Sequence, residues 1–153
     1  MILSEFEVYL ENQIPVLVKL KDYDLKDRII EEPKDIKDFF CEELNLNRFA
    51  EERLYLLATN QRNKPIGLFL ITKGTGNCSI FSPREMLIRL ALVGATNFFI
   101  VHNHPSGDVT LSKDDEKTYN RMREVGKLTN FNLIDFIIIG GNDYYSMLES
   151  KNK

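Results

Sequence analysis

The chain has 153 residues, of which 43% are hydrophobic and 28% are charged, and its formal net charge is −3. This length is enough for one domain with its own hydrophobic core, and the composition is that of an ordinary globular protein. A negative net charge offers no general basic surface for a phosphate backbone, which argues against nucleic acid as the main partner. The two cysteines, Cys41 and Cys78, form no CxxC pair, which argues against a thiolate metal site.

The N-terminal residues lack the basic and apolar regions of a secretory signal peptide, and no apolar run approaches the length of a membrane span. Two cysteines without a secretory signal predict reduced thiols. We therefore expect a cytoplasmic protein that has no membrane partner.

The first part of the chain predicts a hairpin and a helix. Residues 4–20 alternate weakly between apolar and polar side chains, with a polar break at residues 11–13, which indicates two paired strands. Pro33 suits the first position of a helix, and the apolar side chains that follow it recur at helical spacing. This helix is expected to end near residues 45–47.

The middle of the chain predicts two strands joined by a polar turn, over residues 53–59 and 66–72, and a short edge strand over 78–81. Ser82-Pro83-Arg84-Glu85 is typical of a helix start, because serine caps the helix, proline fits its first turn and glutamate answers the free amides. The helix is expected to run to residue 93, which a glycine follows.

Three further strands are expected over residues 97–102, 132–139 and 144–148. Between the first two of them, a loop over residues 104–111 leads into a second capping box, Ser112 to Asp115, which opens a helix expected to stop near Gly126. Strands and helices alternate along the chain, so the fold class is mixed α/β with hairpins.

The only two histidines, His102 and His104, are two residues apart at the end of the strand over 97–102. Residues at i and i+2 of a strand project from the same face, so both imidazoles can bind one metal ion. Asp115 offers a third ligand, although a capping role also accounts for it, and Asp108 and Asp114 are rival ligands. Two histidines and one carboxylate leave a fourth position open, as in catalytic zinc sites.

The whole stretch over residues 101–115, VHNHPSGDVTLSKDD, has the pattern His-x-His-x7-Ser-x2-Asp. This pattern resembles the JAMM metalloprotease signature, and its form His-Asn-His-Pro-Ser-Gly is similar to the RadC family within that fold. The similarity continues in Gly74-Thr75-Gly76-Asn77, in the helix start at residues 82–85 and in the strand over residues 133–140. It covers about residues 50–149.

The resemblance implies an α/β fold of the cytidine-deaminase-like, JAB/MPN type, whose mixed sheet is flanked by helices. On this basis residues 49–153 are expected to form the RadC-like JAB/MPN domain. Residues 1–48 are expected to form a short N-terminal extension with a hairpin and one helix.

The resemblance also assigns roles to individual residues. His102, His104 and Asp115 correspond to the zinc ligands, and Ser112 to a serine that holds the scissile carbonyl or the tetrahedral intermediate. Glu52 corresponds to a glutamate at the start of an upstream strand, which acts as general base and then as general acid. The implied function is a Zn²⁺-dependent metallopeptidase or isopeptidase whose substrate is a peptide or a protein conjugate.

Two other glutamates compete with Glu52 for the role of base. Glu51 is its neighbour, but adjacent strand residues face opposite sides, so only one of the two can point at the metal. Glu85 is a weaker rival, because its capping position already accounts for it.

The chain departs from the RadC pattern at two positions. Ser82 stands where the family usually has histidine, and Asp135-Phe136 stands where it usually has Asp-His. Residues 1–50 also show no helix-hairpin-helix of the kind found in full-length RadC-like proteins. Two alternative functions stay open, namely a DNA-repair-associated protein acting near nucleic acid and a metal-stabilised binding module without turnover. The oligomeric state is open as well.

Overall fold

The structure is a computed structural model that describes residues 1–74 and 80–153. The strands are β1 (Ile2–Glu11), β2 (Ile14–Asp24), β3 (Arg53–Thr59), β4 (Pro65–Lys73), β5 (Asn97–Asn103), β6 (Asn132–Gly140) and β7 (Asp143–Ser146). The helices are α1 (Pro33–Glu42), the 3-10 turn η1 (Leu46–Arg48), α2 (Pro83–Val93), α3 (Lys113–Thr129) and α4 (Met147–Lys151).

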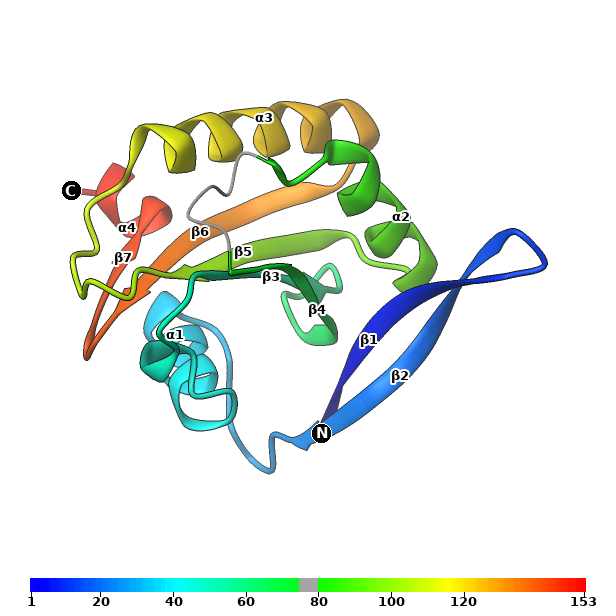
Figure 1. Cartoon of the computed structure of the whole chain (residues 1–153), viewed down its shortest axis with the longest axis horizontal. Helices are drawn as coiled ribbons and strands as arrows, with labels where there is room; N and C mark the ends of the chain where they lie inside the picture. Colours follow the sequence, from blue (N-terminus) through cyan, green and yellow to red (C-terminus); the bar gives the residue numbers. More distant parts are fainter. Residues whose placement is uncertain (75–79) are drawn as a thin grey trace.

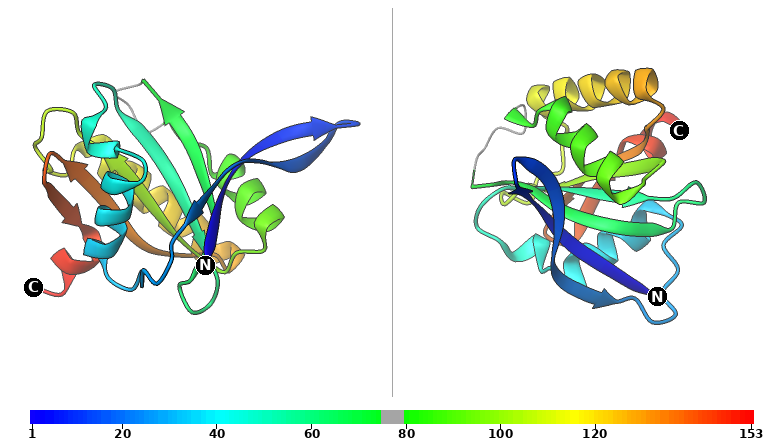
Figure 2. Two further views of the ribbon diagram at one scale, coloured as in Figure 1. Left: turned by 90° about the horizontal axis from the view of Figure 1, so that it is seen from below. Right: turned by 90° about the vertical axis from the view of Figure 1, so that its right-hand side faces the viewer.

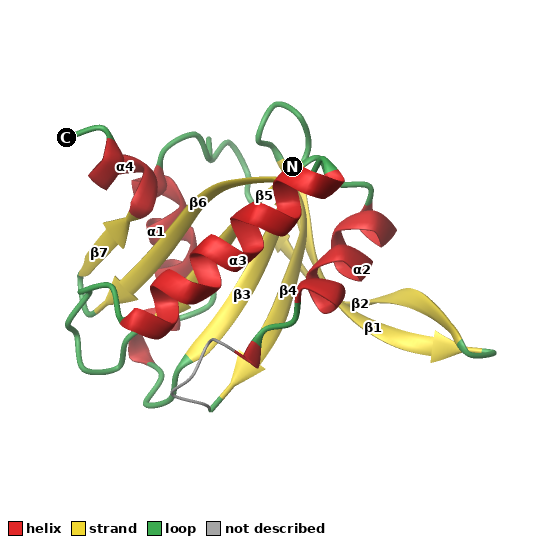
Figure 3. Ribbon diagram, turned by 90° about the horizontal axis from the view of Figure 1, so that it is seen from above, coloured by secondary structure: helices red, strands yellow, loops and turns green. Residues whose placement is uncertain are grey.

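The strands of the described ranges form one seven-stranded sheet in the order β2-β1-β4-β3-β5-β6-β7. The pairs β1–β4 and β5–β6 are parallel, and the other pairs are antiparallel. Helices α2 and α3 lie on one face of the sheet and α1 on the other (Figure 1), and Figure 3 shows α3 running across the sheet beside α2. The prediction of a mixed α/β fold of the JAB/MPN type is therefore confirmed.

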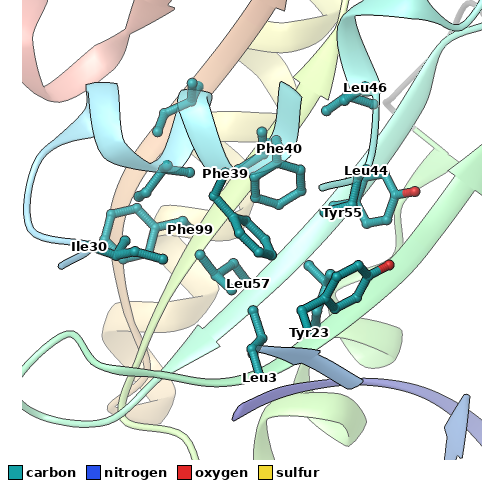
Figure 4. Close-up of a cluster of buried hydrophobic side chains, with 14 of the residues drawn as sticks. Leu3, Tyr23, Ile30, Phe39, Phe40, Leu44, Leu46, Tyr55, Leu57 and Phe99 are labelled. Atoms are coloured by element: carbon teal, nitrogen blue, oxygen red, sulfur yellow. The ribbon is translucent and has the colours of Figure 1, made fainter. Parts of the chain in front are cut away.

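One face of the sheet is covered by α1, whose aromatic side chains enter a buried cluster (Figure 4). Phe39 and Phe40 are fully buried, and the Phe40 ring meets the Tyr55 ring of β3 edge-on, with 5.4 Å between centroids. Burial of each such ring stabilises the fold by roughly 1.5–3 kcal/mol. Helix α1 begins where predicted, since Pro33 occupies its first turn behind a capping box.

The opposite face packs against α2 and α3 and decides where the first histidine points. Side chains alternate along β5, so Phe98 and Ile100 enter the cluster formed with Met122 of α3. His102 continues the same alternation and therefore faces the helix side of the sheet. The alternation of side chains along β5 is therefore sufficient to direct the His102 imidazole towards α3.

The N-terminal hairpin is confirmed. Strands β1 and β2 pair along their whole length, and Asn12 and Gln13 both have positive φ angles, as a two-residue hairpin turn requires. β1 pairs with β4 at one position, Glu5 opposite Leu68, so the hairpin projects from the body as an arm (Figure 2). The division of the chain after residue 48 stays a prediction.

The expected end of the long helix at Gly126 is wrong. Helix α3 continues to Thr129 and ends at Asn130, which takes the left-handed conformation with φ of 61°. A Cβ on Gly126 would lie 2.4 Å from the carbonyl oxygen of Phe131. Glycine is needed there for close packing, and Asn130 ends the helix.

The expected final strand over residues 144–148 is also wrong in its second half. β7 ends at Ser146, whose hydroxyl accepts a hydrogen bond from the Glu149 amide at 3.1 Å and so caps α4. Residues 78 and 79 of the expected edge strand lie outside the described residues, as do residues 75–77 of the Gly-Thr-x-Asn segment. In the described ranges, no helix has both the length and the apolar character that a membrane span needs.

Candidate metal centre

His102, His104 and Asp115 come together at one point on the helix side of the sheet. The Nε2 atoms of the two histidines are 3.0 Å apart. Asp115 Oδ1 lies 2.9 Å from His102 Nε2, and Asp115 Oδ2 lies 3.2 Å from His104 Nε2. His102 and Asp115 are almost fully buried, whereas the His104 side chain is 12% exposed. The cluster therefore has one accessible side.

The backbone places both imidazoles. His102 lies near the end of β5, and the His104 amide donates to the Ile139 carbonyl of β6 at 2.8 Å. Strand pairing therefore continues beyond the end of β5, and the two side chains keep the common face that the i, i+2 spacing predicts.

Asp115 is held by the capping box of α3. Its amide donates to Ser112 Oγ at 3.0 Å, and its Oδ2 accepts from the Ser112 amide at 2.9 Å. The capping role and the approach to the histidines thus coexist in one carboxylate. The start of α3 therefore places the Asp115 carboxylate, the third possible metal ligand, beside the two histidines at the end of β5.

The loop after His104 fixes the orientation of its ring. His104 Nδ1 lies 2.7 Å from the Asp108 carbonyl oxygen, so Nδ1 carries a proton and Nε2 faces the cluster. The loop packs closely on β6, because a Cβ on Gly140 would lie 2.7 Å from the Gly107 carbonyl oxygen. This contact supports the segment that carries the second imidazole.

The electrostatics of the cluster favour a cation. Burial alone would raise the pKa of the Asp115 carboxyl, but its contacts with His102 and His104 hold that pKa well below its usual range. The contact with Asp115 in turn raises the pKa of His104 despite the partial burial of the ring. Two imidazole nitrogens and a carboxylate this close present lone pairs to one another, so the arrangement is stable only when a proton or a metal cation lies between them.

The donor set fits a zinc ion. All the ligand atoms lie within 4.8 Å of one another, and ligand atoms held tetrahedrally at zinc bond lengths are about 3.3 Å apart. The observed separations of 2.9 to 3.2 Å are close to that value. Two imidazoles and one carboxylate also match zinc's preference for nitrogen and oxygen ligands.

The profile of a family described as "RadC-like JAB domain" matches residues 30–152. The chain belongs to this family. Among curated proteins, it is 38% identical over 130 residues to a UPF0758 protein of Staphylococcus carnosus, which covers 85% of this chain and 56% of the relative. A UPF0758 protein of Clostridium perfringens is 34% identical over 148 residues, covering 97% of this chain and 61% of the relative. The chain thus spans little more than half the length of these relatives.

Beside the donors of this RadC-like domain lies a cavity of about 250 Å³. Its lining residues are Glu52, His104, Pro105, Ser106, Ser112, Asp114 and Asp115. The structure therefore places Glu52, His104, Ser112 and Asp115 in the cavity wall, and His102 contacts His104 and Asp115 beside it. The sequence reasoning missed Pro105 and Ser106, although their position next to His104 in a short loop was an available signal.

Strand alternation places the two rival glutamates on opposite sides. Leu54 pairs with His102 and packs on the same face, so Glu52, two residues earlier, also belongs to the helix side. The Glu51 carboxylate pairs instead with Arg53 Nη2 at 3.0 Å. Glu52 lines the cavity and Glu51 is held by its neighbour.

The remaining rivals have other partners. Glu85 pairs with Arg89 at 3.0 Å and lies at a different cavity. The Asp108 carboxylate accepts from the amide of Thr110 at 2.9 Å in a local turn. Asp114 lines the same cavity as Asp115, but the group of ligand atoms that converges consists of the two histidines and Asp115.

The two departures from the RadC pattern have different consequences. The Phe136 ring centroid lies 6.1 Å from that of His102 and 6.2 Å from that of Tyr119. The His102 imidazole thus packs against the apolar ring of Phe136, at a position where the family usually has the polar ring of a histidine. Ser82 caps α2 by accepting from the Arg84 amide at 3.2 Å.

Proposed function

We propose that this RadC-like domain is a zinc-dependent amide hydrolase of the metallopeptidase or isopeptidase type. The observation that carries the proposal is the convergence of His102, His104 and Asp115 at a cavity that Glu52 also lines. Three protein donors with an open side are the arrangement of catalytic zinc sites, because structural sites are closed by four protein ligands.

Zinc held by these residues would supply Lewis acidity and lower the pKa of a bound water towards neutrality. The chain supplies the rest of the chemistry. Glu52 takes a proton from the attacking water and delivers it to the leaving amine. Ser112 Oγ accepts from the Asp115 amide and keeps its own O–H, which can donate to the developing oxyanion.

The shape of the cavity supports an extended substrate. About 250 Å³ is below the usual volume of pockets that enclose small molecules, and His104, which lines the cavity, is the most exposed member of the triad. An extended chain needs to place only the bond to be cleaved and its nearest neighbours in a cavity of this size. We therefore propose a peptide or a protein conjugate as the substrate.

Metal binding is the first test. Protein stripped with a chelator and titrated with Zn²⁺ at neutral pH should bind one equivalent, and His104→Ala should lose this binding. Asp108→Ala is the matched control, because it removes a rival carboxylate in the same loop and should retain the metal. Wild-type protein that binds no zinc tightly would refute the proposal.

Turnover is the second test, measured on a library of internally quenched peptides and lysine isopeptides. Glu52→Gln should bind zinc as the wild type does and lose about 10²- to 10⁴-fold in kcat, which is the usual contribution of a general base. Glu85→Gln, the same substitution at a glutamate beside a different cavity, should retain kcat. Equal activity of wild type and Glu52→Gln would remove Glu52 from the mechanism.

A further inference from the structure

Asn103 lies between the two histidines and takes no part in the cluster they form. It is the last residue of β5 and is 1% exposed. Because side chains alternate along the strand, its side chain leaves the sheet away from the imidazoles of His102 and His104. A buried amide at this position must find hydrogen-bond partners elsewhere.

The Asn103 side chain finds them at the start of β3 and just before it. Its Oδ1 accepts from the Arg53 amide at 2.7 Å, and its Nδ2 donates to the Glu51 carbonyl oxygen at 3.0 Å. The last backbone pair between β3 and β5 is Leu54 with His102. The side-chain amide of Asn103 therefore acts as an additional peptide group and extends the β3–β5 ladder beyond its last backbone pair.

Both contacts flank Glu52. On the opposite side, the Gly74 amide donates to the Glu52 carbonyl oxygen at 2.9 Å. The Arg53 guanidinium pairs with Glu51 and stacks on the Phe49 ring, 3.4 Å from its centroid. The backbone from Glu51 to Arg53 is thus hydrogen-bonded on both its β5 side and its β4 side. This fixes its orientation, so that the Glu52 side chain lies on the face of the sheet that carries the metal ligands.

We propose that Asn103 is the positioning residue for Glu52, aligning the general base with the metal ligands that flank Asn103 in sequence. The inference rests on the proposed function. One strand end carries both the imidazoles and the amide that fixes the base, so the distance between base and metal is set within a single segment. Without this amide, the Glu51 carbonyl and Arg53 amide lose their partner, and the segment turns to find another.

The test compares Asn103→Ala with Asn97→Ala. Asn97 is a buried asparagine at the other end of β5, where its Nδ2 donates to Asn63 at 2.8 Å and its Oδ1 accepts from Asn132 at 3.0 Å. Both variants remove a buried amide from the same strand, but only one of them faces the segment that carries Glu52. Asn103→Ser, whose shorter side chain cannot span both partners, serves if the alanine variant does not fold.

The first readout does not depend on activity. In Asn103→Ala, hydrogen exchange at the Arg53 amide should accelerate by about 10-fold or more, while the affinity for Zn²⁺ stays within about 3-fold of wild type. Asn97→Ala should leave Arg53 exchange unchanged. Unaltered exchange at Arg53 in Asn103→Ala, or a loss of zinc binding as large as that of His104→Ala, would overturn the positioning role.

The second readout is a double-mutant cycle with Glu52→Gln on the quenched library. Asn103→Ala should lower kcat by about 10- to 100-fold, as is usual for groups that orient a site, with KM little changed. In the Glu52→Gln background it should lower kcat no further, because its effect passes through the missing carboxylate. The same loss in both backgrounds would overturn the inference and leave the proposed function intact. A wild type that cleaves nothing refutes the proposed function, and Arg53 exchange still decides whether Asn103 holds the segment.

Discussion

Asp135 is a buried carboxylate whose titration should dominate one part of the pH dependence of stability. It is 1% exposed. Its Oδ1 accepts from the amides of Phe136 and Leu148, each at 2.8 Å, and its Oδ2 accepts from the Ser146 hydroxyl at 2.5 Å. Burial raises the pKa of Asp135 to about 6 even though these hydrogen bonds oppose the shift.

The sign and size of the effect follow from linkage. An unfolded aspartate has a pKa of about 3.9, so the folded state binds this proton more tightly. The stabilisation is present below about pH 4 and is lost as the pH rises through about 6. A shift of about two units corresponds to about 3 kcal/mol.

In Asp135→Asn the side-chain amide oxygen can still accept from both backbone amides, but the hydrogen bond donated by the Ser146 hydroxyl is lost, which costs about 1 kcal/mol. Asp135→Asn should therefore be about 2 kcal/mol more stable than wild type at pH 8.

The assay is urea unfolding of wild type and Asp135→Asn from pH 4 to pH 8 in a chelator, so that metal does not contribute. The difference in unfolding free energy should rise in favour of the variant between pH 4 and pH 6 and then level off. Asp22→Asn is the control, because Lys19 and Ser4 hold the pKa of the exposed Asp22 below its usual value, so its difference curve should not rise between pH 4 and pH 6. A flat difference curve for Asp135→Asn would refute the reasoning.

Three further predictions concern the metal centre. Gly140→Ala should weaken zinc binding by about 10- to 100-fold, measured by competition with a chromophoric chelator, because its Cβ would displace the Gly107 carbonyl and the loop that carries His104. Removal of metal should abolish hydrolysis but leave the far-UV circular dichroism unchanged, since none of the three metal ligands belongs to either apolar cluster; unfolding on chelation would favour a metal-stabilised module instead. Apparent zinc affinity should fall as the pH is lowered from 8 to 6, because Asp115 raises the pKa of His104 and protons compete for its Nε2; a pH-independent affinity over this range would contradict this.

Local patterns were sufficient for most of the fold. The helix-start patterns at Ser82 and Ser112 predicted the starts of α2 and α3, and the apolar run over residues 53–59 predicted β3 at its observed bounds. The error at Gly126 came where packing, rather than the local pattern, decides the outcome. Gly126 resembles a helix end in the sequence, but it lies where the chain returns from α3 towards β6 and allows no Cβ.

In the candidate site, too, some features follow from the local sequence and others depend on contacts between distant parts of the chain. The spacing of His102, His104 and Asp115 is local, because a strand end, a loop and a helix start follow one another in the chain. The part played by Asn103 depends instead on the register between β3 and β5, which places it beside residues 50 positions earlier. No pattern within residues 101–115 contains that information.

Asp115 joins two processes that are separate in most metal sites. The carboxylate that faces the histidines also closes the capping box of the 17-residue helix α3. A bound ion would therefore suppress fraying of the first helical turn, and fraying of that turn would weaken the binding of the ion. Exchange of the amides at the start of α3 would then be a direct measure of metal occupancy, readable without any substrate.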